Sequence, residues 1–376
     1  MGSSLATRQQ KQAVVEASGR PALLLDWYDR HRRRLPWRPP PGEQADPYRV
    51  WLSEIMLQQT GVKTVGPYFE KFLARWPGVD ALGRASLDDV LRMWAGLGYY
   101  SRARNLHACA VAVLRDHGGV FPDTEQGLQA LPGIGPYTAA AIASFAFDLP
   151  FAVVDGNVTR VLARYFGIAT PIDSTAGKKE FAAMAMELLD PHQAGAYNQA
   201  IMDFGATVCT PRNPQCSSCV QQTSCVARQQ GTIDQLPVKA KTIRKKQRCF
   251  YYFIAETPED EVYIRRRTGK DIWEGLYEFI LYETTEAAGP AEILQSDFAR
   301  QLFDGQALTV RYISNVHRQE LSHQSLQGQF ITVRLSRPLR NLNDYHPVPK
   351  SALAAYPFPK FINSWLSHPS PAQTLF

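Results

Sequence analysis

The sequence LPGIGPYT, at residues 131–138, has two glycines in three residues with a proline on each side, and it leads directly into the apolar sequence AAAIASFAF. It predicts a tight turn followed at once by a helix, because glycine permits unusual backbone angles and Pro136 suits a first helical turn. Backbone N–H groups at a helix N-terminus attract anions. We therefore expect the backbone at Gly133 and Gly135 to approach an anionic group closely.

The segments on both sides of this turn have apolar residues at helical spacing, with prolines and glycines between them. We therefore predict an all-α domain over residues 22–231, after an N-terminal extension of residues 1–21. The clearest i, i+3, i+4, i+7, i+8 pattern is that of Val158, Val161, Leu162, Tyr165 and Phe166. The expected helices lie at residues 20–31, 48–60, 65–76, 87–97, 103–117, 137–147, 157–166 and 179–189.

From residue 248 the period changes to short segments that are rich in β-branched and aromatic residues, as strands are. We predict a smaller α+β domain over residues 248–376, and read the basic stretch 232–247 as the interdomain linker. The expected strands lie at residues 249–256, 261–267, 275–283, 308–321 and 328–336, and the sequence LQSDFARQLF, at 294–303, is expected to be a helix among them.

Composition sets limits on the class of protein. A chain of 376 residues favours two domains, and 45% hydrophobic residues argue against disorder. The net charge of +6 is clustered in HRRR at 31–34 and KAKTIRKKQR at 239–248, and each run taken alone is interpreted as solvated surface charge. No apolar run reaches the roughly 18 residues of a membrane span, and the N-terminus lacks a secretory core. We expect a cytoplasmic protein.

Four cysteines near the end of the helical domain have six, two and five residues between them: Cys209, Cys216, Cys219 and Cys225. A reducing compartment disfavours disulfides, so four thiolates in one loop are better read as ligands of a single centre. Zinc and a [4Fe–4S] cluster both take four thiolates, and the spacing alone leaves the two nearly even. Cys109 and Cys249 are interpreted as buried, inert thiols.

Two carboxylates are candidates for chemistry. Glu54 lies in the apolar sequence WLSEIMLQQT, where partial desolvation would raise its pKa and suit it as a general acid. The alternative is an exposed position on an amphipathic helix. Asp155, in FAVVDGNVTRVL, is expected to cap a helix, and a carboxylate there can also stabilise positive charge on a sugar.

The glycine turn is not a phosphate-binding loop of the Walker type, because no Gly-Lys-Ser/Thr sequence follows it. With helices before and after, it is typical of a helix–hairpin–helix, which holds a DNA phosphate without reading the bases. The alternative is an ordinary turn between helices. Together with the cysteine loop and the basic charge, the turn favours DNA as the partner.

Five motifs in this order resemble the adenine-specific DNA glycosylases of the MutY family, within the helix–hairpin–helix superfamily: WLSEIMLQQT, GLGYYSRARNLH, LPGIGPYT, VVDGNVTRVLAR and the cysteine loop. The resemblance covers residues 22–231 densely and the C-terminal domain more loosely. It implies a glycosylase that removes adenine paired with 8-oxoguanine or G in double-stranded DNA, acting as a monomer near the nucleoid. Adenine must leave the base stack to be reached.

The resemblance also implies the catalytic roles. Glu54 would protonate N7 of adenine, Asp155 would stabilise the oxocarbenium-like sugar, and Asn157 would support their hydrogen bonds. Bifunctional relatives carry a lysine where this chain has Tyr137, and tyrosine cannot form their imine. A monofunctional enzyme that leaves an abasic site is therefore expected.

Other roles follow from the same resemblance. Tyr99 would insert beside 8-oxoguanine, and Gln59 and Thr60 would contact the opposing base. The cysteine loop would hold a [4Fe–4S] cluster with a structural role. Residues matching the adenine pocket are Trp37, Arg38, Leu57 and Gln199.

The C-terminal domain resembles a Nudix-like module that recognises 8-oxoguanine, without the glutamate-rich box that a Nudix hydrolase needs. Its recognition loop usually reads Phe-Ser-His, whereas this chain has Leu321-Ser322-His323. Ser322 and His323 would contact the damaged base. Two other functions stay open: a bifunctional glycosylase–lyase for oxidised pyrimidines, and a non-catalytic DNA-binding protein with a cluster.

Overall fold

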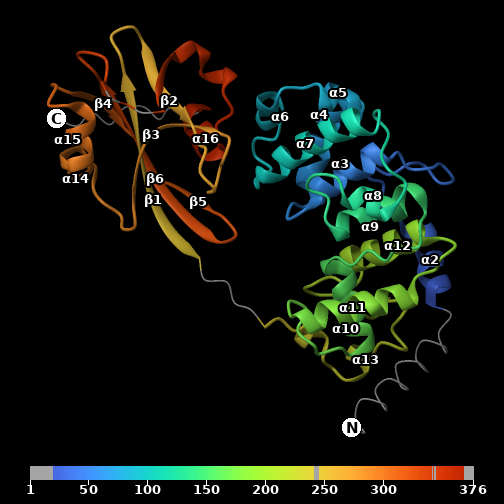
Figure 1. The fold of residues 1–376 in the computed structure, drawn as a ribbon. Helices are drawn as coiled ribbons and strands as arrows, with labels where there is room; N and C mark the ends of the chain where they lie inside the picture. The colour runs from blue at the N-terminus through green and yellow to red at the C-terminus, as the bar shows by residue number, and fades with distance from the viewer. Residues whose placement is uncertain (1–19, 241–244, 341, 343, 368–376) are drawn as a thin grey trace. The chain divides into compact units, whose positions relative to one another are not determined.

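A computed structural model of the chain describes residues 20–240, 245–340, 342 and 344–367. By their internal contacts these residues divide into two compact units: residues up to 84 together with 105–241, and residues 85–104 together with those from 242 onwards. The described chain is helical up to residue 235, and all of its strands come after residue 245 (Figure 1). Among the described residues, no helix is long and apolar enough to cross a membrane.

Helices account for most of residues 20–235, as the apolar spacing predicts. Their bounds are α2 (Arg20–His31), α3 (Pro47–Leu57), α4 (Val62–Arg75), α5 (Val79–Gly83), α6 (Leu87–Met93), α7 (Ser101–Asp116), α8 (Glu125–Gln129), α9 (Pro136–Phe147), α10 (Gly156–Phe166), α11 (Thr175–Leu188), α12 (Ala194–Thr207), α13 (Val226–Gln229) and the 3-10 turn η1 (Ile233–Gln235).

The glycine turn lies between α8 and α9, so the predicted helix–turn–helix is confirmed. Gly133 has a φ of +73°, a left-handed conformation that favours glycine. Gly135 is the N-cap of α9 and Pro136 is its first residue. A Cβ atom at Gly135 would meet no atom within 4 Å, so its backbone is open to close approach.

The helices pack around a core that α2, α10, α11 and α12 share. All five residues of the periodic pattern in α10 are buried, which confirms that prediction. The helix begins at the N-cap Asp155 and ends at Gly167, whose φ of +65° stops it in a left-handed conformation. The helix α3, which carries Glu54, also packs against α9, the helix that follows the glycine turn.

The C-terminal unit is built on a mixed seven-stranded sheet with the order β4-β6-β1-β3-β2-β7, and β5 pairs with β6. The strand β1 is central: it runs parallel to β6 and antiparallel to β3. The strands are β1 (Lys246–Glu256), β2 (Glu261–Arg266), β3 (Tyr277–Thr284), β4 (Thr309–Ile313), β5 (His317–Glu320), β6 (Gln324–Arg334) and β7 (His346–Pro349), with the helices α14 (Pro290–Gln295), α15 (Asp297–Phe303), η2 (Lys350–Ala355) and α16 (Lys360–Ser367).

Two predicted segments are divided in the structure. The expected helix at 294–303 is broken at Ser296, whose extended backbone ends α14 and whose hydroxyl caps α15. The expected strand at 308–321 is two strands, because residues 314–316 leave the sheet between β4 and β5. The strand predicted from residue 249 begins earlier, at Lys246.

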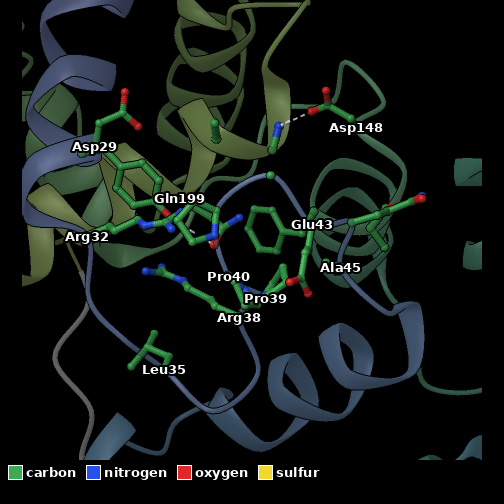
Figure 2. A pocket seen from close by; sticks show the side chains of 18 of the residues that line it. Asp29, Arg32, Leu35, Arg38, Pro39, Pro40, Glu43, Ala45, Asp148 and Gln199 are labelled. Atoms are coloured by element: carbon green, nitrogen blue, oxygen red, sulfur yellow. Dashed lines mark hydrogen bonds between the residues drawn. The ribbon is translucent and has the colours of Figure 1, made fainter.

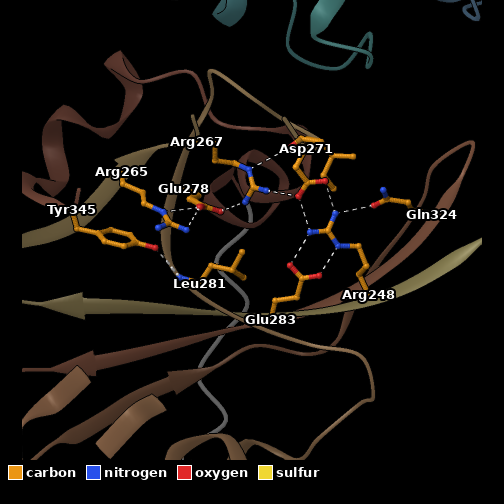
Figure 3. Close-up of polar contacts among 10 residues, drawn as sticks. Arg248, Arg265, Arg267, Asp271, Glu278, Leu281, Glu283, Gln324 and Tyr345 are labelled. Carbon is orange, nitrogen blue, oxygen red and sulfur yellow. Dashed lines mark hydrogen bonds and ion pairs between the residues drawn. The ribbon is translucent and has the colours of Figure 1, made fainter. Parts of the chain in front are cut away.

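The basic run 239–248 is not uniformly solvated. Residues 241–244 lie outside the described residues, but Arg248 is buried and forms ion pairs with Asp271 and Glu283 (Figure 3). The interpretation as free surface charge is therefore wrong for Arg248. Nearby, the fully buried Glu278 accepts hydrogen bonds from Arg265 and Arg267, so its buried charge is paired.

Candidate active site

The helix α3 carries Glu54 into the interior. Asp46 caps the helix by accepting a hydrogen bond from the backbone N–H of Tyr48 at 2.9 Å, and Pro47 occupies the first position. Most of the helix is buried, and Glu54 itself is only 5% exposed. The alternative of an exposed position for Glu54 is therefore wrong.

Glu54 lies in the wall of a cavity together with four residues that the resemblance assigned to the adenine pocket. Trp37 and Arg38 come from the loop after α2, Leu57 from the end of α3 and Gln199 from α12. Apolar side chains make up most of the remaining lining, among them Val50, Val62, Phe145 and Met202. A mainly apolar lining with a few convergent polar groups is typical of a small-molecule site, and in this structure the cavity has a volume of about 60 Å³.

Tyr137, in the first turn of α9, touches the carboxyl group of Glu54. Its hydroxyl donates to Oε2 of Glu54 at 3.2 Å. Burial, and then the charges of Glu54 and Asp155, raise the pKa of Tyr137 well above its usual value. Tyr137 is therefore a neutral hydrogen-bond donor here and provides no amine.

Glu54 is poised to hold a proton near neutral pH. Burial raises the pKa of Glu54 to about 7, and the negative charge of Asp155 contributes in the same direction. The hydrogen bond from Tyr137 and the charge of Arg38 act against this rise. A carboxyl group that titrates near neutral pH can deliver a proton to a bound base, as a general acid must.

Asp155 caps α10 as predicted. Its Oδ1 accepts from the backbone N–H groups of Asn157 at 2.8 Å and Val158 at 2.7 Å. Its Oδ2 accepts from the side-chain amide of Asn157 at 2.7 Å, and Arg160 in turn donates to Oδ1 of Asn157 at 2.8 Å. The carboxylate is thus fixed by several donors while it stays partly exposed.

The end of α3 is tied to the hairpin helix. The side-chain amide of Gln58 donates to Oγ1 of Thr138 at 3.3 Å. The next residue, Gln59, is exposed and has a φ of +61°, which is uncommon for a residue other than glycine. Thr60 follows in the same turn. Strain of this kind clusters at binding sites, so the turn is a candidate contact surface.

Two further groups of predicted contact residues lie outside this cavity. Tyr99 is 42% exposed and has a φ of +49°. Ser322 and His323 are exposed at the turn between β5 and β6, where the N–H of Leu321 donates to the carbonyl of Gln324 at 2.8 Å. The hydroxyl groups of Tyr99 and Ser322 are hydrogen-bonded to each other, and the side chain of His323 is exposed.

The four predicted ligand cysteines line one cavity. The backbone N–H of Gln221 lies 3.4 Å from Sγ of Cys219, and Nη1 of Arg164 lies 3.6 Å from Sγ of Cys209. Burial raises the pKa of Cys219 to about 11. N–H groups directed at sulfur, and four cysteines that line one cavity, fit a cluster held by cysteine thiolates. Among the described residues, no group of three or more His, Cys, Asp or Glu side chains is arranged to hold a single metal ion.

The other two cysteines are buried, as predicted. Burial raises the pKa of Cys109 to about 12, so this thiol stays protonated. Cys249 lies inside β1 and not at its start.

Arg33 and Asp203 are functional candidates that the sequence did not single out. Arg33 belongs to the run HRRR, which was interpreted as solvated, but its side chain lines the cavity of Glu54 and pairs with Asp203. The earlier interpretation is wrong for Arg33. Asp203 has no exposed surface, and nothing in the local sequence marks it, because its partners lie 165–170 residues away.

Beside the cavity lies a wider groove of about 1080 Å³. Figure 2 shows Arg38, Pro39 and Gln199 in its wall, and these three residues also line the cavity of Glu54. The groove and the cavity therefore share a wall.

Comparison with known proteins gives matches for both halves of the chain. Residues 52–191 match the family model of the HhH-GPD superfamily base excision DNA repair proteins, and residues 251–368 match that of the NUDIX domain. The chain is 38% identical to the adenine DNA glycosylase of Buchnera aphidicola subsp. Schizaphis graminum over 267 residues, which are 70% of this chain and 74% of that protein.

The human adenine DNA glycosylase is 46% identical over 228 residues, which are 59% of this chain and 42% of the human protein. The match therefore spans less than half of the human relative. A thermostable thymine-DNA glycosylase of known structure is 28% identical with a TM-score of 0.51, over 60% of this chain and 99% of that one.

Proposed function

Because the chain belongs to the adenine DNA glycosylase family, we propose that it is a monofunctional DNA glycosylase that removes adenine paired with 8-oxoguanine or G. The observation that carries the proposal is the buried carboxyl group of Glu54. It titrates near neutral pH in the wall of a cavity lined by Trp37, Arg38, Leu57 and Gln199.

The reaction begins with adenine turned out of the duplex into the cavity of Glu54. The protonated carboxyl group of Glu54 donates its proton to N7 of the base, which makes adenine a better leaving group. The bond between the base nitrogen and C1′ of the sugar breaks, and its electron pair goes to the base. The proton on N7 neutralises the charge that the base would otherwise carry.

The sugar becomes an oxocarbenium-like cation as the bond breaks. The carboxylate of Asp155, fixed by Asn157 and Val158, stabilises this cation electrostatically. Water then adds to C1′ and gives a proton to the carboxylate that Glu54 has become, which restores the acid and leaves an abasic site. Tyr137 holds Glu54 by a hydrogen bond and has no amine to form an imine with the sugar. The proposal therefore excludes strand cleavage by this residue.

Contacts with DNA are assigned to the exposed features around the cavity. The open backbone at Gly135, in the turn that Gly133 makes possible, would receive one phosphate at the N-terminus of α9. Gln59 and Thr60 would face the base opposite the extruded adenine, and Tyr99 would insert beside it. Ser322 and His323 of the Nudix-like domain would recognise 8-oxoguanine.

A direct test compares three duplexes that carry adenine opposite 8-oxoguanine, G or T. After treatment with alkali, the wild-type protein is expected to give a cut adenine strand for the first two. Without alkali the strand should stay whole, and borohydride should trap no strong covalent adduct with abasic DNA. Binding without excision would overturn the proposal.

The variant Glu54→Gln tests the acid. It should bind the same duplex as tightly as the wild type but lose excision by about 10²–10⁴-fold, the usual contribution of general acid catalysis. The exposed Asp148→Asn is a matched control that leaves the carboxyl groups of the cavity intact. Excision by Glu54→Gln at a rate close to that of the wild type would remove Glu54 from this role.

We also propose that Cys209, Cys216, Cys219 and Cys225 hold a [4Fe–4S] cluster. The fit is supported by their shared cavity and by the N–H groups directed at two of the sulfurs. When bound, the cluster would supply structural stability to the loop after α12. Iron analysis should find about four irons per chain, and Cys219→Ser should lower that content. One zinc per chain and no iron would refute the assignment.

A further inference from the structure

Two arginines of the candidate adenine pocket converge on a single buried carboxylate, that of Asp203. Nε and Nη2 of Arg33 donate to Oδ1 of Asp203 at 2.8 and 2.5 Å, and the backbone N–H of Arg33 donates to Oδ2 at 3.1 Å. Nη1 and Nη2 of Arg38 donate to Oδ2 and Oδ1 at 2.6 and 2.9 Å. Arg38 therefore forms a two-point contact with both carboxylate oxygens of Asp203, whereas the guanidinium group of Arg33 is held by Oδ1 alone.

Asp203 has no exposed surface and lies on α12 one turn after Gln199. Burial by itself would raise the pKa of Asp203, but the hydrogen bonds from Arg38 and Arg33 outweigh it, and the pKa lies below its usual value. Asp203 is thus a buried carboxylate whose negative charge is stabilised by its two arginine partners. Arg33, Arg38 and Gln199 all line the cavity of Glu54, whereas Asp203 lies behind them.

One member of this cluster, Arg38, acts directly on Glu54. The groups that act on Glu54 are Tyr137 of α9, Asp155 at the start of α10, and Arg38. Arg38 favours the ionised form of Glu54, and the negative charge of Asp203 partly compensates Arg38. With Asp203 the two arginines carry a net charge of +1, and without it they would carry +2.

We propose that Asp203 is a positioning residue of the adenine pocket, which fixes Arg33 and Arg38 in its wall and compensates their charge so that Glu54 keeps its proton. This rests on the proposed function of the site. A purely structural role, in which Asp203 only ties α12 to the loop after α2, would affect stability without changing the titration of Glu54.

The test uses the full-length Asp203→Asn variant, whose side chain has nearly the same shape and no charge. Glutamate carboxyl groups are labelled with carbon-13, and the Glu54 signal is assigned by its loss in Glu54→Gln. In Asp203→Asn we expect the titration midpoint of Glu54 to shift to lower pH than in the wild type. Single-turnover excision should fall by about 10- to 100-fold near pH 8, with a smaller change in duplex affinity.

Three variants separate charge from packing. Asp203→Asn combined with Arg33→Gln restores the net charge of +1 and should move the midpoint back towards the wild type. Tyr137→Phe removes a hydrogen bond that favours ionised Glu54, so it should shift the midpoint in the opposite direction. Asp148 is an exposed carboxylate that accepts a hydrogen bond from the N–H of Gly195, which lies on α12 as Asp203 does. Asp148→Asn should leave the midpoint of Glu54 unchanged.

An unchanged Glu54 midpoint in a folded Asp203→Asn protein would overturn the proposal. If Asp203→Asn does not fold, the double variant is compared with Arg33→Gln alone, because the two differ only at Asp203. An equal titration midpoint of Glu54 in these two proteins would refute charge compensation. These titrations need no catalysis. A shifted midpoint in a protein that excises no adenine would therefore contradict the proposed function and leave the role of Asp203 intact.

Discussion

At the scale of single residues, the molecule keeps an acid ready to react by burying it. Glu54 lies in the apolar helix α3, accepts a hydrogen bond from Tyr137 and is close enough to Asp155 to feel its charge. Desolvation raises the pKa of this carboxyl group more than its neighbours do. The same burial that suits Glu54 for proton transfer makes its ionised form costly for the fold.

This cost can be measured as a pH-dependent stability. The pKa of Glu54 rises from an ordinary 4.5 to about 7 on folding, so its contribution to stability is complete below about pH 4.5 and is lost as pH rises through about 7. Glu54→Gln does not titrate. Near pH 8 the variant should therefore be more stable than the wild type by at most about 3 kcal/mol, because each unit of pKa shift corresponds to about 1.4 kcal/mol.

Denaturant unfolding of both proteins at pH 5 and pH 8 checks this expectation. The two should have similar stability at the lower pH and differ at the higher one. A wild type that is the more stable protein at pH 8 would mean that Glu54 is ionised without penalty in the folded state.

At the scale of elements, the turn between α8 and α9 uses its two glycines for different physical reasons. Gly133 has a φ of +73°, and a Cβ atom there would lie 2.5 Å from Cβ of Asn105. Gly135 has an ordinary φ of −87° and open space around it. The first glycine is required by the fold, and the second leaves a helix N-terminus accessible.

These two roles predict that alanine at Gly133 and alanine at Gly135 affect different properties of the protein. Gly133→Ala should lower the free energy of unfolding by about 1–3 kcal/mol through backbone strain and the contact with Asn105. Gly135→Ala should leave stability nearly unchanged but weaken binding to duplex DNA, because a methyl group would stand where a phosphate approaches. Thermal unfolding and a DNA-binding titration distinguish the two. Equal DNA affinity for Gly135→Ala and wild type would argue against a phosphate at this turn.

At the scale of the whole molecule, catalysis and recognition of the opposing base are proposed for different domains. The carboxyl groups of Glu54 and Asp155 belong to the helical part of the chain, and Ser322 and His323 belong to the Nudix-like part. Leu321 precedes them and is partly buried, whereas both of them are exposed.

Replacing Ser322 or His323 should therefore change the preference for 8-oxoguanine over G more than it changes the rate of adenine excision itself. In Ser322→Ala and His323→Ala we expect the ratio of excision opposite 8-oxoguanine to excision opposite G to fall, while the rate opposite G stays close to that of the wild type. Single-turnover assays on both duplexes measure this ratio. Arg300→Ala, which removes an exposed ion pair with Asp297 elsewhere in the same domain, is a suitable control.

The sequence by itself determined the features that depend on neighbours in the chain. The apolar period of α10, the glycine turn before α9 and the change to strands near residue 248 are local patterns, and the four cysteines lie within one loop. Tertiary structure alone decided the charge environment of the site. Whether Glu54 is dry, and whether Arg33 is solvated or held by Asp203, depends on side chains from distant segments, because desolvation and ion pairing are set by what packs together in space.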